Sequence, residues 1–247
     1  MQTNHISHSL LTMLLMESME LASKNRGEAR VVNITCSSRC VPYIMLKPEY
    51  FLQCEPDELG GNNPWFVRDI FKRQGPFTRY QQSKLASACF SMALHMKLNQ
   101  LGSKVKSLVA DPGVVNTNLN FSAVEQGVMS PCLANSLSYV STTPSIGVLS
   151  ILVACFGDSS ECKSGDLYSP AKISTGLPVK TVAAGSPVKS GNEKLVCHPT
   201  NIRTAWESTE KSLGVRFESE KDSKNMIGIR VEDLILNNEG EQDSSKV

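Results

Sequence analysis

Apolar residues recur at helical spacing in the first stretch of the chain. Within residues 1–24, leucines at positions 10, 11, 14 and 15 form one stripe along a helix. A helix in a globular protein buries such a stripe against a neighbouring element. We therefore expect a helix over residues 1–24 whose leucine stripe packs against a second helix, over residues 78–101.

The second helix is the most strongly patterned part of the chain. Apolar side chains on one of its faces are Leu85, Ala88, Cys89, Met92 and Met96, and we expect most of this face to serve core packing. A further helix is expected from residue 142 through the apolar run 146–156, and a short amphipathic helix over residues 201–213 around Trp206.

Short runs rich in β-branched residues predict the strands. Residues 30–35 and 105–110 are buried-type strands, and residues 165–168 form the expected last strand. Residues 171–192, rich in Gly, Pro, Val and Lys, are predicted to form a loop. Strands that alternate with helices predict an α/β fold with a parallel sheet.

Composition narrows the class of protein. Of the 247 residues, 40% are hydrophobic and 20% charged, with a net charge of +1, so no nucleic acid is expected as a partner. The eight cysteines form no C-x-x-C pair, which indicates reduced thiols and an intracellular protein. The four histidines are scattered, so no metal site is expected. The longest apolar run is too short to span a bilayer.

Candidate chemistry begins at Tyr80 and Lys84. Side chains four positions apart share one face of a helix, and a nearby ammonium favours the phenolate and lowers the pKa of a tyrosine. Such a tyrosine exchanges a proton with an alcohol or carbonyl oxygen near neutral pH. The same spacing also occurs in solvated pairs without a function.

The order of motifs gives this pair a context. The strand ARVVNITCSS precedes YQQSKLA, and the strand KVKSLVADPGVVNTNL follows it. This order resembles the short-chain dehydrogenase/reductase family, in particular the branch of retinol dehydrogenases and WW-domain oxidoreductases. The resemblance covers residues 2–215 and implies a Rossmann-type doubly wound parallel sheet that binds NAD(P).

The resemblance also implies roles for residues. Tyr80 would be the catalytic acid/base, and Lys84 would tune it and hold the nicotinamide ribose. The family serine that binds the substrate oxygen falls on Cys36 in the simplest alignment, and a shift of one residue gives Ser37, which we expect to be the working residue. Asn4 matches a family asparagine that supports a proton relay; as a helix cap it would have only a structural role.

The stretch after the second strand matches a family segment that contacts the nicotinamide carboxamide. The matching positions are Pro112, Gly113, Val115 and Thr117. A plain strand-ending turn is the alternative interpretation.

One family motif is absent from the sequence. The glycine-rich T-G-x-x-x-G-x-G turn that holds the dinucleotide phosphates does not occur. We therefore expect residues 1–215 to form only the C-terminal portion of the family domain, truncated at the N-terminus, and binding of NAD(P)(H) by this chain to be weak or lost. We also expect an insertion at about residues 59–73 and a charged, disordered tail over residues 216–247.

Two functions remain open at this point. The first is an NAD(P)-dependent oxidoreductase, in an incomplete or inactive form, acting on a small-molecule alcohol or carbonyl, with lipophilic compounds among the candidate substrates. The second is a non-catalytic remnant that binds partner proteins. The family resemblance further implies a homodimer through the helices at 4–24 and 80–101.

Overall fold

The computed structural model describes most of the chain, namely residues 1–40, 43–52, 59, 75–125, 131–173, 182–190 and 193–215. The expected insertion at 59–73, apart from Leu59, and the expected tail at 216–247 lie outside the described residues. Those two expectations stay predictions.

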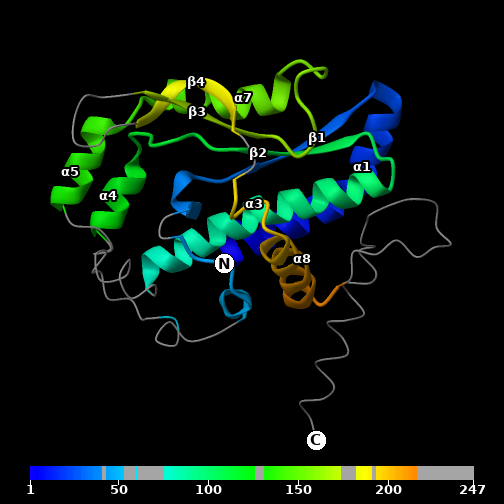
Figure 1. Cartoon of the computed structure of the whole chain (residues 1–247), viewed down its shortest axis with the longest axis horizontal. Helices are drawn as coiled ribbons and strands as arrows, with labels where there is room; N and C mark the ends of the chain where they lie inside the picture. Colours follow the sequence, from blue (N-terminus) through cyan, green and yellow to red (C-terminus); the bar gives the residue numbers. More distant parts are fainter. Residues whose placement is uncertain are drawn as a thin grey trace, which may run out of the picture.

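The described elements form an α/β fold around one sheet of four strands (Figure 1). The strands, in their order across the sheet, are β1 (Ala29–Ile34), β2 (Val105–Ala110), β3 (Leu167–Ile173) and β4 (Val182–Ser190). The first three are parallel, and β4 runs antiparallel to β3. The α/β class expected from the sequence is confirmed, with the mostly parallel sheet of a Rossmann-like arrangement.

Helices cover both faces of the sheet. On one face lie α1 (Ser7–Arg26), which continues a π-helical segment at Gln2–Ile6, and α3 (Pro76–Gln100), with α8 (Pro199–Leu213) packed against α3 (Figure 1). On the other face lies α7 (Leu149–Phe156), which contacts all four strands. The shorter elements are α4 (Asn118–Glu125), α5 (Pro131–Val140), α6 (Pro144–Gly147) and the 3₁₀ turns η2 (Ser37–Cys40) and η3 (Pro48–Phe51).

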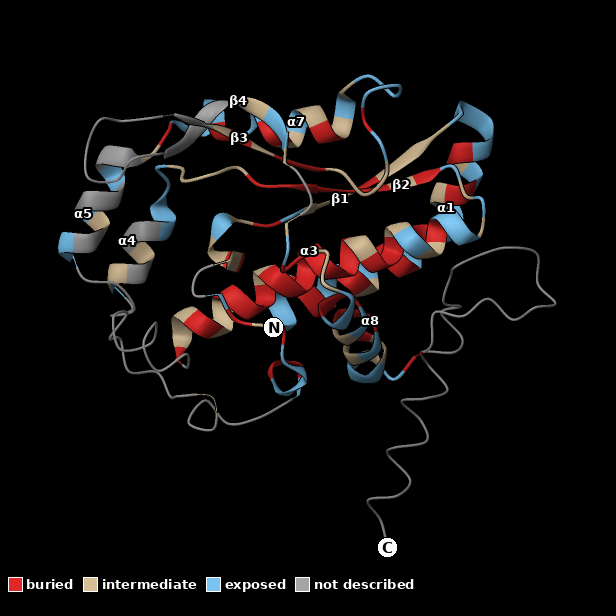
Figure 2. Cartoon of the chain, in the orientation of Figure 1, coloured by how far each residue is buried: buried red, intermediate tan, exposed pale blue. Residues whose placement is uncertain are grey.

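The core lies between α3 and the sheet, where Figure 2 shows α3 and β2 mostly in the colour of buried residues. β2 is a central strand in which every residue except the half-buried Lys106 is buried, as expected for a strand covered on both faces. Phe90, Leu94 and Leu98 of α3 are fully buried beside it. Both parallel strands and the long helix expected from the sequence are present to within two residues.

The expected role of the leucine stripe in residues 1–24 is wrong. A helix is present, but Leu11, Leu14 and Leu15 are 53%, 37% and 47% exposed, whereas Met13 and Met16 are completely buried. This helix is apolar on two sides, so helical spacing alone does not indicate which side faces the core. The more flexible methionine side chains fill the space against the core.

The loop expected over residues 171–192 is also wrong in part. β3 continues to Ile173, and β4 returns beside it as an antiparallel strand with an irregular register between Pro170 and Lys172. The sequence of β4 is rich in Ala, Gly, Ser and Pro, residues with low strand propensity. Its pairing with β3, and not its own composition, makes it a strand.

Polar side chains connect α3 to the two central strands. The Asn33 side chain donates to Ser91 Oγ at 2.7 Å, and Ser107 Oγ donates to the carbonyl oxygen of Ser91 at 2.9 Å. At the end of β1, Thr35 Oγ1 donates to the carbonyl oxygen of Lys84 at 2.8 Å. These bonds fix the height of α3 over the sheet, because each buried polar group needs its partner.

His5 is a buried polar residue at the contact between the N-terminal helical segment and α8. It is 1% exposed, its Nε2 is 2.7 Å from Thr209 Oγ1, and its ring packs edge-on against Phe51 and Phe90. Burial lowers the pKa of His5 from 6.5 to about 3, so the imidazole stays neutral in the folded protein. In the described part of the chain, no helix combines the length and apolar character needed to cross a membrane.

The two sides of α1 can be tested with adjacent substitutions. Met16→Ala should lower the free energy of unfolding by about 2–5 kcal/mol, because it opens a cavity in the core. Leu15→Ala, on the exposed side, should change it by less than about 0.5 kcal/mol. Urea denaturation of both variants measures this; equal losses would contradict the assignment of the buried face.

The buried His5 predicts a pH dependence of stability. Because the folded pKa is lowered, the unfolded chain binds a proton below pH 6.5 that the folded chain does not bind until about pH 3. Stability is therefore expected to be complete above pH 6.5 and to fall as the pH drops, with His5 contributing about 2 kcal/mol of the loss between pH 7 and pH 5.

Urea denaturation at several pH values measures this slope. His5→Gln should flatten it, while His8→Gln, at an exposed position, serves as the control and should leave it unchanged. An unaltered slope in His5→Gln would refute the prediction.

Candidate functional site

The site is built around the first turns of α3. Gly75, with φ at 104°, and Pro76 at the first helical position start this helix. Proline is favoured there because its fixed φ suits a helix and its missing N–H has no intrahelical partner to lose. Tyr80 therefore lies in the second turn, at the end of the molecule where β1 and β2 have their carboxyl ends (Figure 1).

Tyr80 and Lys84 share one face of α3. Lys84 Nζ lies 5.8 Å from the centroid of the Tyr80 ring, over the ring face. Among the described residues, Lys84 forms no ion pair with a carboxylate. The ammonium group therefore has hydrogen-bonding capacity left for another group, since it carries three donors.

Cys36, and not Ser37, lies beside the phenol. Cys36 Sγ is 3.4 Å from the Tyr80 hydroxyl, to which the thiol can donate, and 2.6 Å from Ser38 Oγ. Ser37 begins the 3₁₀ turn η2 and is exposed. The hydrogen-bonding group next to Tyr80 is thus a thiol, which is a weaker donor than a hydroxyl.

The electrostatic environment of Tyr80 differs from the one expected. Burial raises the pKa of Tyr80, and the neighbouring Cys36 and Asp111 side chains raise it further. We expected Lys84 to lower this pKa. Its ammonium lies over the ring, 5.8 Å from the centroid, and desolvation of the phenol is the dominant effect on the pKa.

Asn4 connects the N-terminal helical segment to α3. The side-chain Nδ2 of Asn4 donates to Ser83 Oγ at 3.0 Å, and Ser87 Oγ donates to the main-chain carbonyl oxygen of Asn4 at 3.0 Å. Asn4 lies inside the π-helical segment, so the interpretation of this residue as a helix cap is wrong. Its two serine partners lie on the same helix as Tyr80, within two turns.

The loop after β2 approaches the same end of the sheet. Gly113 has φ at 76°, a left-handed conformation that favours glycine, and its N–H donates to Asp111 Oδ1 at 2.8 Å. Pro112 and Val115 are half-buried, and Thr117 is exposed. The described contacts do not bring Thr117 to Tyr80.

A glycine on α6 holds this loop in place. Val115 forms an isolated bridge with Thr142, and a Cβ on Gly147 would lie 2.4 Å from Val115 Cγ2. Such a contact is too close for any side chain at this position, so Gly147 is required for the close approach of α6 to the loop.

A buried cluster of three charged residues supports the site, and the sequence analysis missed it. Arg39 is 2% exposed, and its guanidinium bonds Asp111 Oδ2 at 2.5 Å and both carboxylate oxygens of Glu193, at 2.5 and 2.8 Å. Gln81 Nε2 donates to the carbonyl oxygen of Arg39 at 2.7 Å. The carboxylates raise the pKa of Arg39 above its ordinary value despite its burial.

The Arg39 cluster joins segments that are distant in sequence. Arg39 follows β1, Asp111 follows β2, and Glu193 precedes α8. No local sequence pattern could have indicated this pairing. Each of the three charged residues lies in a different connecting segment, where a single charged residue is typical of a solvent-exposed loop. Within the described residues, no group of three or more His, Cys, Asp or Glu side chains is arranged to hold a metal ion.

Comparison with curated proteins gives two kinds of relative. Polyprenol dehydrogenase of Mus musculus is 30% identical over 116 residues, which are 47% of this chain and 29% of that protein. Short-chain dehydrogenase TIC 32 A, chloroplastic, of Brassica napus is 33% identical over 121 residues, 47% of this chain and 32% of that protein. The aligned part thus spans about three tenths of the length of these relatives.

Two further comparisons were made. No family model matches the chain. The solved structure of an uncharacterised protein from Mycobacterium paratuberculosis covers 88% of this chain and 59% of its own, with 18% identity and a TM-score of 0.47. The fold described above rests on its own elements and not on this likeness. About half of the chain is thus similar to curated dehydrogenases, in agreement with the resemblance to short-chain dehydrogenases noted in the sequence.

Removing the guanidinium of Arg39, the cation of the Arg39 cluster, should strongly destabilise the fold. Arg39→Met leaves two carboxylates without their buried partner, which should cost about 3–5 kcal/mol of unfolding free energy. The matched control is Lys47→Met, because Lys47 and Glu49 form an ion pair in which both side chains are about half exposed. That control should cost about 0–1 kcal/mol. Denaturant titrations give both values, and a similar small loss in each variant would rule out a structural role for the cluster.

Proposed function

We propose that this protein is a short-chain oxidoreductase that interconverts an alcohol and a carbonyl compound with NAD(P)(H). The observation that carries the proposal is the placement of Tyr80 and Lys84 on one helical face, with Lys84 Nζ 5.8 Å from the Tyr80 ring centroid. The similarity of half the chain to short-chain dehydrogenases supports it.

Tyr80 would move the proton. In alcohol oxidation, the phenolate oxygen accepts the proton of the substrate hydroxyl; in carbonyl reduction, the phenol returns it to the new alkoxide oxygen. Burial and the two neighbouring groups raise the pKa of Tyr80. The protonated phenol therefore prevails at neutral pH in the arrangement described, which favours Tyr80 as the acid in carbonyl reduction.

The residues around Tyr80 fit the nicotinamide end of the cofactor. Lys84 has no carboxylate partner among the described residues and would donate to the ribose hydroxyls. The loop with Pro112, Gly113, Val115 and Thr117 would lie against the carboxamide. When bound, the nicotinamide supplies or accepts the hydride. Since the sequence contains no glycine-rich phosphate turn, we propose that this chain alone holds the cofactor weakly, as an incomplete or inactive form.

Cys36 or Ser37 would orient the substrate oxygen. The 3.4 Å contact between Cys36 Sγ and the Tyr80 hydroxyl favours Cys36. A thiol there gives a longer and weaker hydrogen bond than the family serine, so it would position the substrate less firmly. Asn4, bonded to Ser83 and Ser87 on α3, would support a proton relay through water.

A lipophilic alcohol is the first substrate class to test. Two of the curated relatives are named polyprenol dehydrogenases, and a polyprenol is a long-chain lipid alcohol. We propose that α4 and α5, which lie at the same end of the molecule as the start of α3 (Figure 1), shape the specificity for such a substrate.

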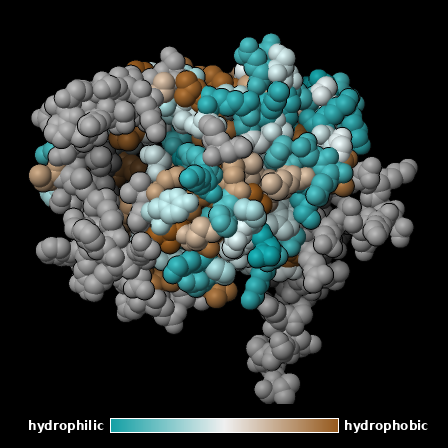
Figure 3. Space-filling view, viewed as in Figure 1, coloured by the Kyte–Doolittle hydropathy of each residue, from teal (hydrophilic) through white to brown (hydrophobic). Residues whose placement is uncertain are grey.

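The alternative function is a protein-interaction module without catalysis. It is favoured by exposed apolar side chains: Leu11, Leu14 and Leu15 on α1, and Phe156, 81% exposed, on α7. Figure 3 shows apolar atoms along the upper edge of the molecule, where α7 lies. The expected homodimer would use the α1 stripe more than α3, because most of α3 is already buried within the chain. Alcohol turnover by a version extended at its N-terminus with a dinucleotide-binding segment separates the two functions, since only the oxidoreductase catalyses the reaction.

The acid/base role predicts a sharp effect of one substitution. In a version extended at its N-terminus by the dinucleotide-binding segment of a short-chain dehydrogenase, Tyr80→Phe should lower turnover of an alcohol about 10²- to 10⁴-fold. Phe keeps the ring and its packing but moves no proton, so NADPH affinity should persist. Steady-state kinetics and fluorescence titration with NADPH measure the two quantities.

Lys84→Ala provides the comparison. It should reduce both turnover and NADPH affinity if Lys84 holds the ribose, whereas Tyr80→Phe should reduce turnover only. A Tyr80→Phe protein that keeps more than about a tenth of the parental rate, far above the usual loss, would show that Tyr80 is not the acid/base.

A further inference from the structure

Two polar groups lead away from the Tyr80 hydroxyl in a row. The Cys36 thiol donates to that hydroxyl at 3.4 Å, and Cys36 Sγ is 2.6 Å from Ser38 Oγ. Because the thiol proton is directed to Tyr80, the Ser38 hydroxyl is the donor to the sulfur. The hydrogen bonds therefore run in one direction, from Ser38 through Cys36 to Tyr80, and they leave the phenol proton for a substrate oxygen.

The turn that carries Cys36 and Ser38 is fixed in place. The Arg39 N–H donates to the carbonyl oxygen of Cys36 at 3.0 Å, and the guanidinium of Arg39 is bonded within the buried Arg39 cluster. Ser38 is only half-buried and follows the exposed Ser37. The inner end of the row is thus held at the phenol, while its outer end is open to water.

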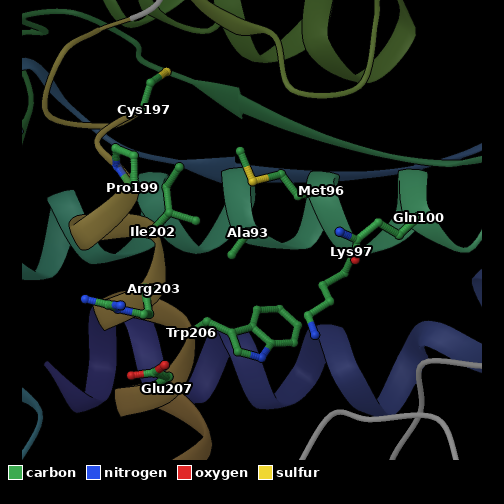
Figure 4. A pocket seen from close by; sticks show the side chains of 10 residues that line it. All are labelled: Ala93, Met96, Lys97, Gln100, Cys197, Pro199, Ile202, Arg203, Trp206 and Glu207. Atoms are coloured by element: carbon green, nitrogen blue, oxygen red, sulfur yellow. The ribbon is translucent and has the colours of Figure 1, made fainter.

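The groove between α3 and α8 offers no comparable route to the phenol. It has a volume of about 400 Å³, and Figure 4 shows its lining side chains, with Lys97 reaching toward the indole of Trp206. Ala93, the lining residue of α3 nearest to Tyr80 in sequence, lies thirteen residues further along the helix. That separation is about 20 Å along the helix axis. The turn at Ser38 is much closer to the phenol than this groove.

A thiol at position 36 can do what a serine hydroxyl cannot. Thiols in general ionise near pH 8.5 and phenols near pH 10, so a thiol gives its proton to a phenolate readily. An aliphatic hydroxyl is a much weaker acid than either group. Burial and the neighbouring side chains raise the pKa of Tyr80, so its phenolate is a stronger base than an ordinary one. The chemistry of Cys36 is therefore suited to returning a proton to Tyr80.

We propose that Cys36 reprotonates Tyr80 after each carbonyl reduction and that Ser38 connects Cys36 to water. This proposal rests on the oxidoreductase function proposed above. Tyr80 first gives its proton to the alkoxide oxygen of the product. The S–H bond of Cys36 then breaks, and its proton goes to the phenolate oxygen. The thiolate takes the proton of the Ser38 hydroxyl, whose oxygen is reprotonated by solvent. This return of the proton follows the transfer to the substrate, so it does not compete with the orienting role of Cys36.

The substitution Cys36→Ser separates proton return from substrate orientation by the direction of its effect. Serine is the stronger hydrogen-bond donor but is no acid for a phenolate. In the version extended at its N-terminus, a purely orienting Cys36 predicts faster carbonyl reduction in Cys36→Ser. We expect steady-state turnover to fall at least about tenfold instead. The first turnover, followed by stopped-flow oxidation of NADPH, should stay within about twofold of the parent, because Tyr80 starts protonated.

The outcomes of this experiment are distinguishable. Steady-state turnover of Cys36→Ser that equals or exceeds that of the parent would overturn the proposal and leave the oxidoreductase function intact. A first turnover that falls as much as the steady state would also overturn it, because the substitution would then act on the proton transfer to the substrate. A parent protein without any turnover would refute both the oxidoreductase function and the proposal.

The contacts can also be tested without catalysis in the 247-residue chain. Iodoacetamide alkylation of Cys36, read by peptide mass spectrometry, is compared at pH 9 and pH 7, since the ratio of the two rates cancels changes in access. Ser38→Ala and Tyr80→Phe should each raise this ratio about threefold, because each removes a hydrogen bond to the thiolate. The exposed Ser145→Ala is the control variant, and the exposed Cys132 is the internal reference. An unchanged ratio in both test variants would refute the proposal even if turnover is found.

Discussion

The ion cluster around Arg39 is the constraint on which the arrangement at this end of the sheet depends. A guanidinium that is almost completely buried is tolerated only when its donors are satisfied, and here Asp111 and Glu193 satisfy them. Because the three residues follow β1, follow β2 and precede α8, their pairing fixes three chain connections at once. Gln81 adds α3 through the carbonyl oxygen of Arg39. The surroundings of Tyr80 are thus set by charges that do not themselves contact the phenol.

The long helix α3 is held over the sheet by hydrogen bonds as much as by apolar contact. Ser83, Ser87 and Ser91 are all buried and all bonded, to Asn4, to the backbone or to Asn33. Apolar packing is tolerant of small shifts, whereas each of these bonds requires a defined distance and angle. The polar face of α3 therefore gives Tyr80 and Lys84 a more precise position than an apolar face would.

The sequence predicted the elements whose patterns have one interpretation. β1 and β2 are short and rich in Val and other apolar residues, and α3 has a long helical repeat, so both kinds of element were found within two residues of their bounds. The outcome was different where a pattern allowed two solutions. α1 is apolar on both sides, and only its tertiary contacts select Met13 and Met16 for the core. β4 has a weak strand composition and is recovered only through its pairing with β3. Likewise, a shift of one residue after β1 separates Ser37 from Cys36, and the sequence could not decide which of them meets the phenol.

The topology of the sheet has a consequence for chain entropy. The parallel partners Val31 and Ser107 are about four times as far apart in sequence as the antiparallel partners Ser169 and Val188. Closing the longer loop costs about 1.2 kcal/mol more conformational entropy, since each doubling of loop length adds about 0.6 kcal/mol. The larger share of this cost falls on the β1–β2 pair, whose carboxyl ends carry Cys36 and Asp111. The intervening helix α3 offsets it by packing against both strands, so the chain that supplies Tyr80 is also the chain that makes the pairing of those strands possible.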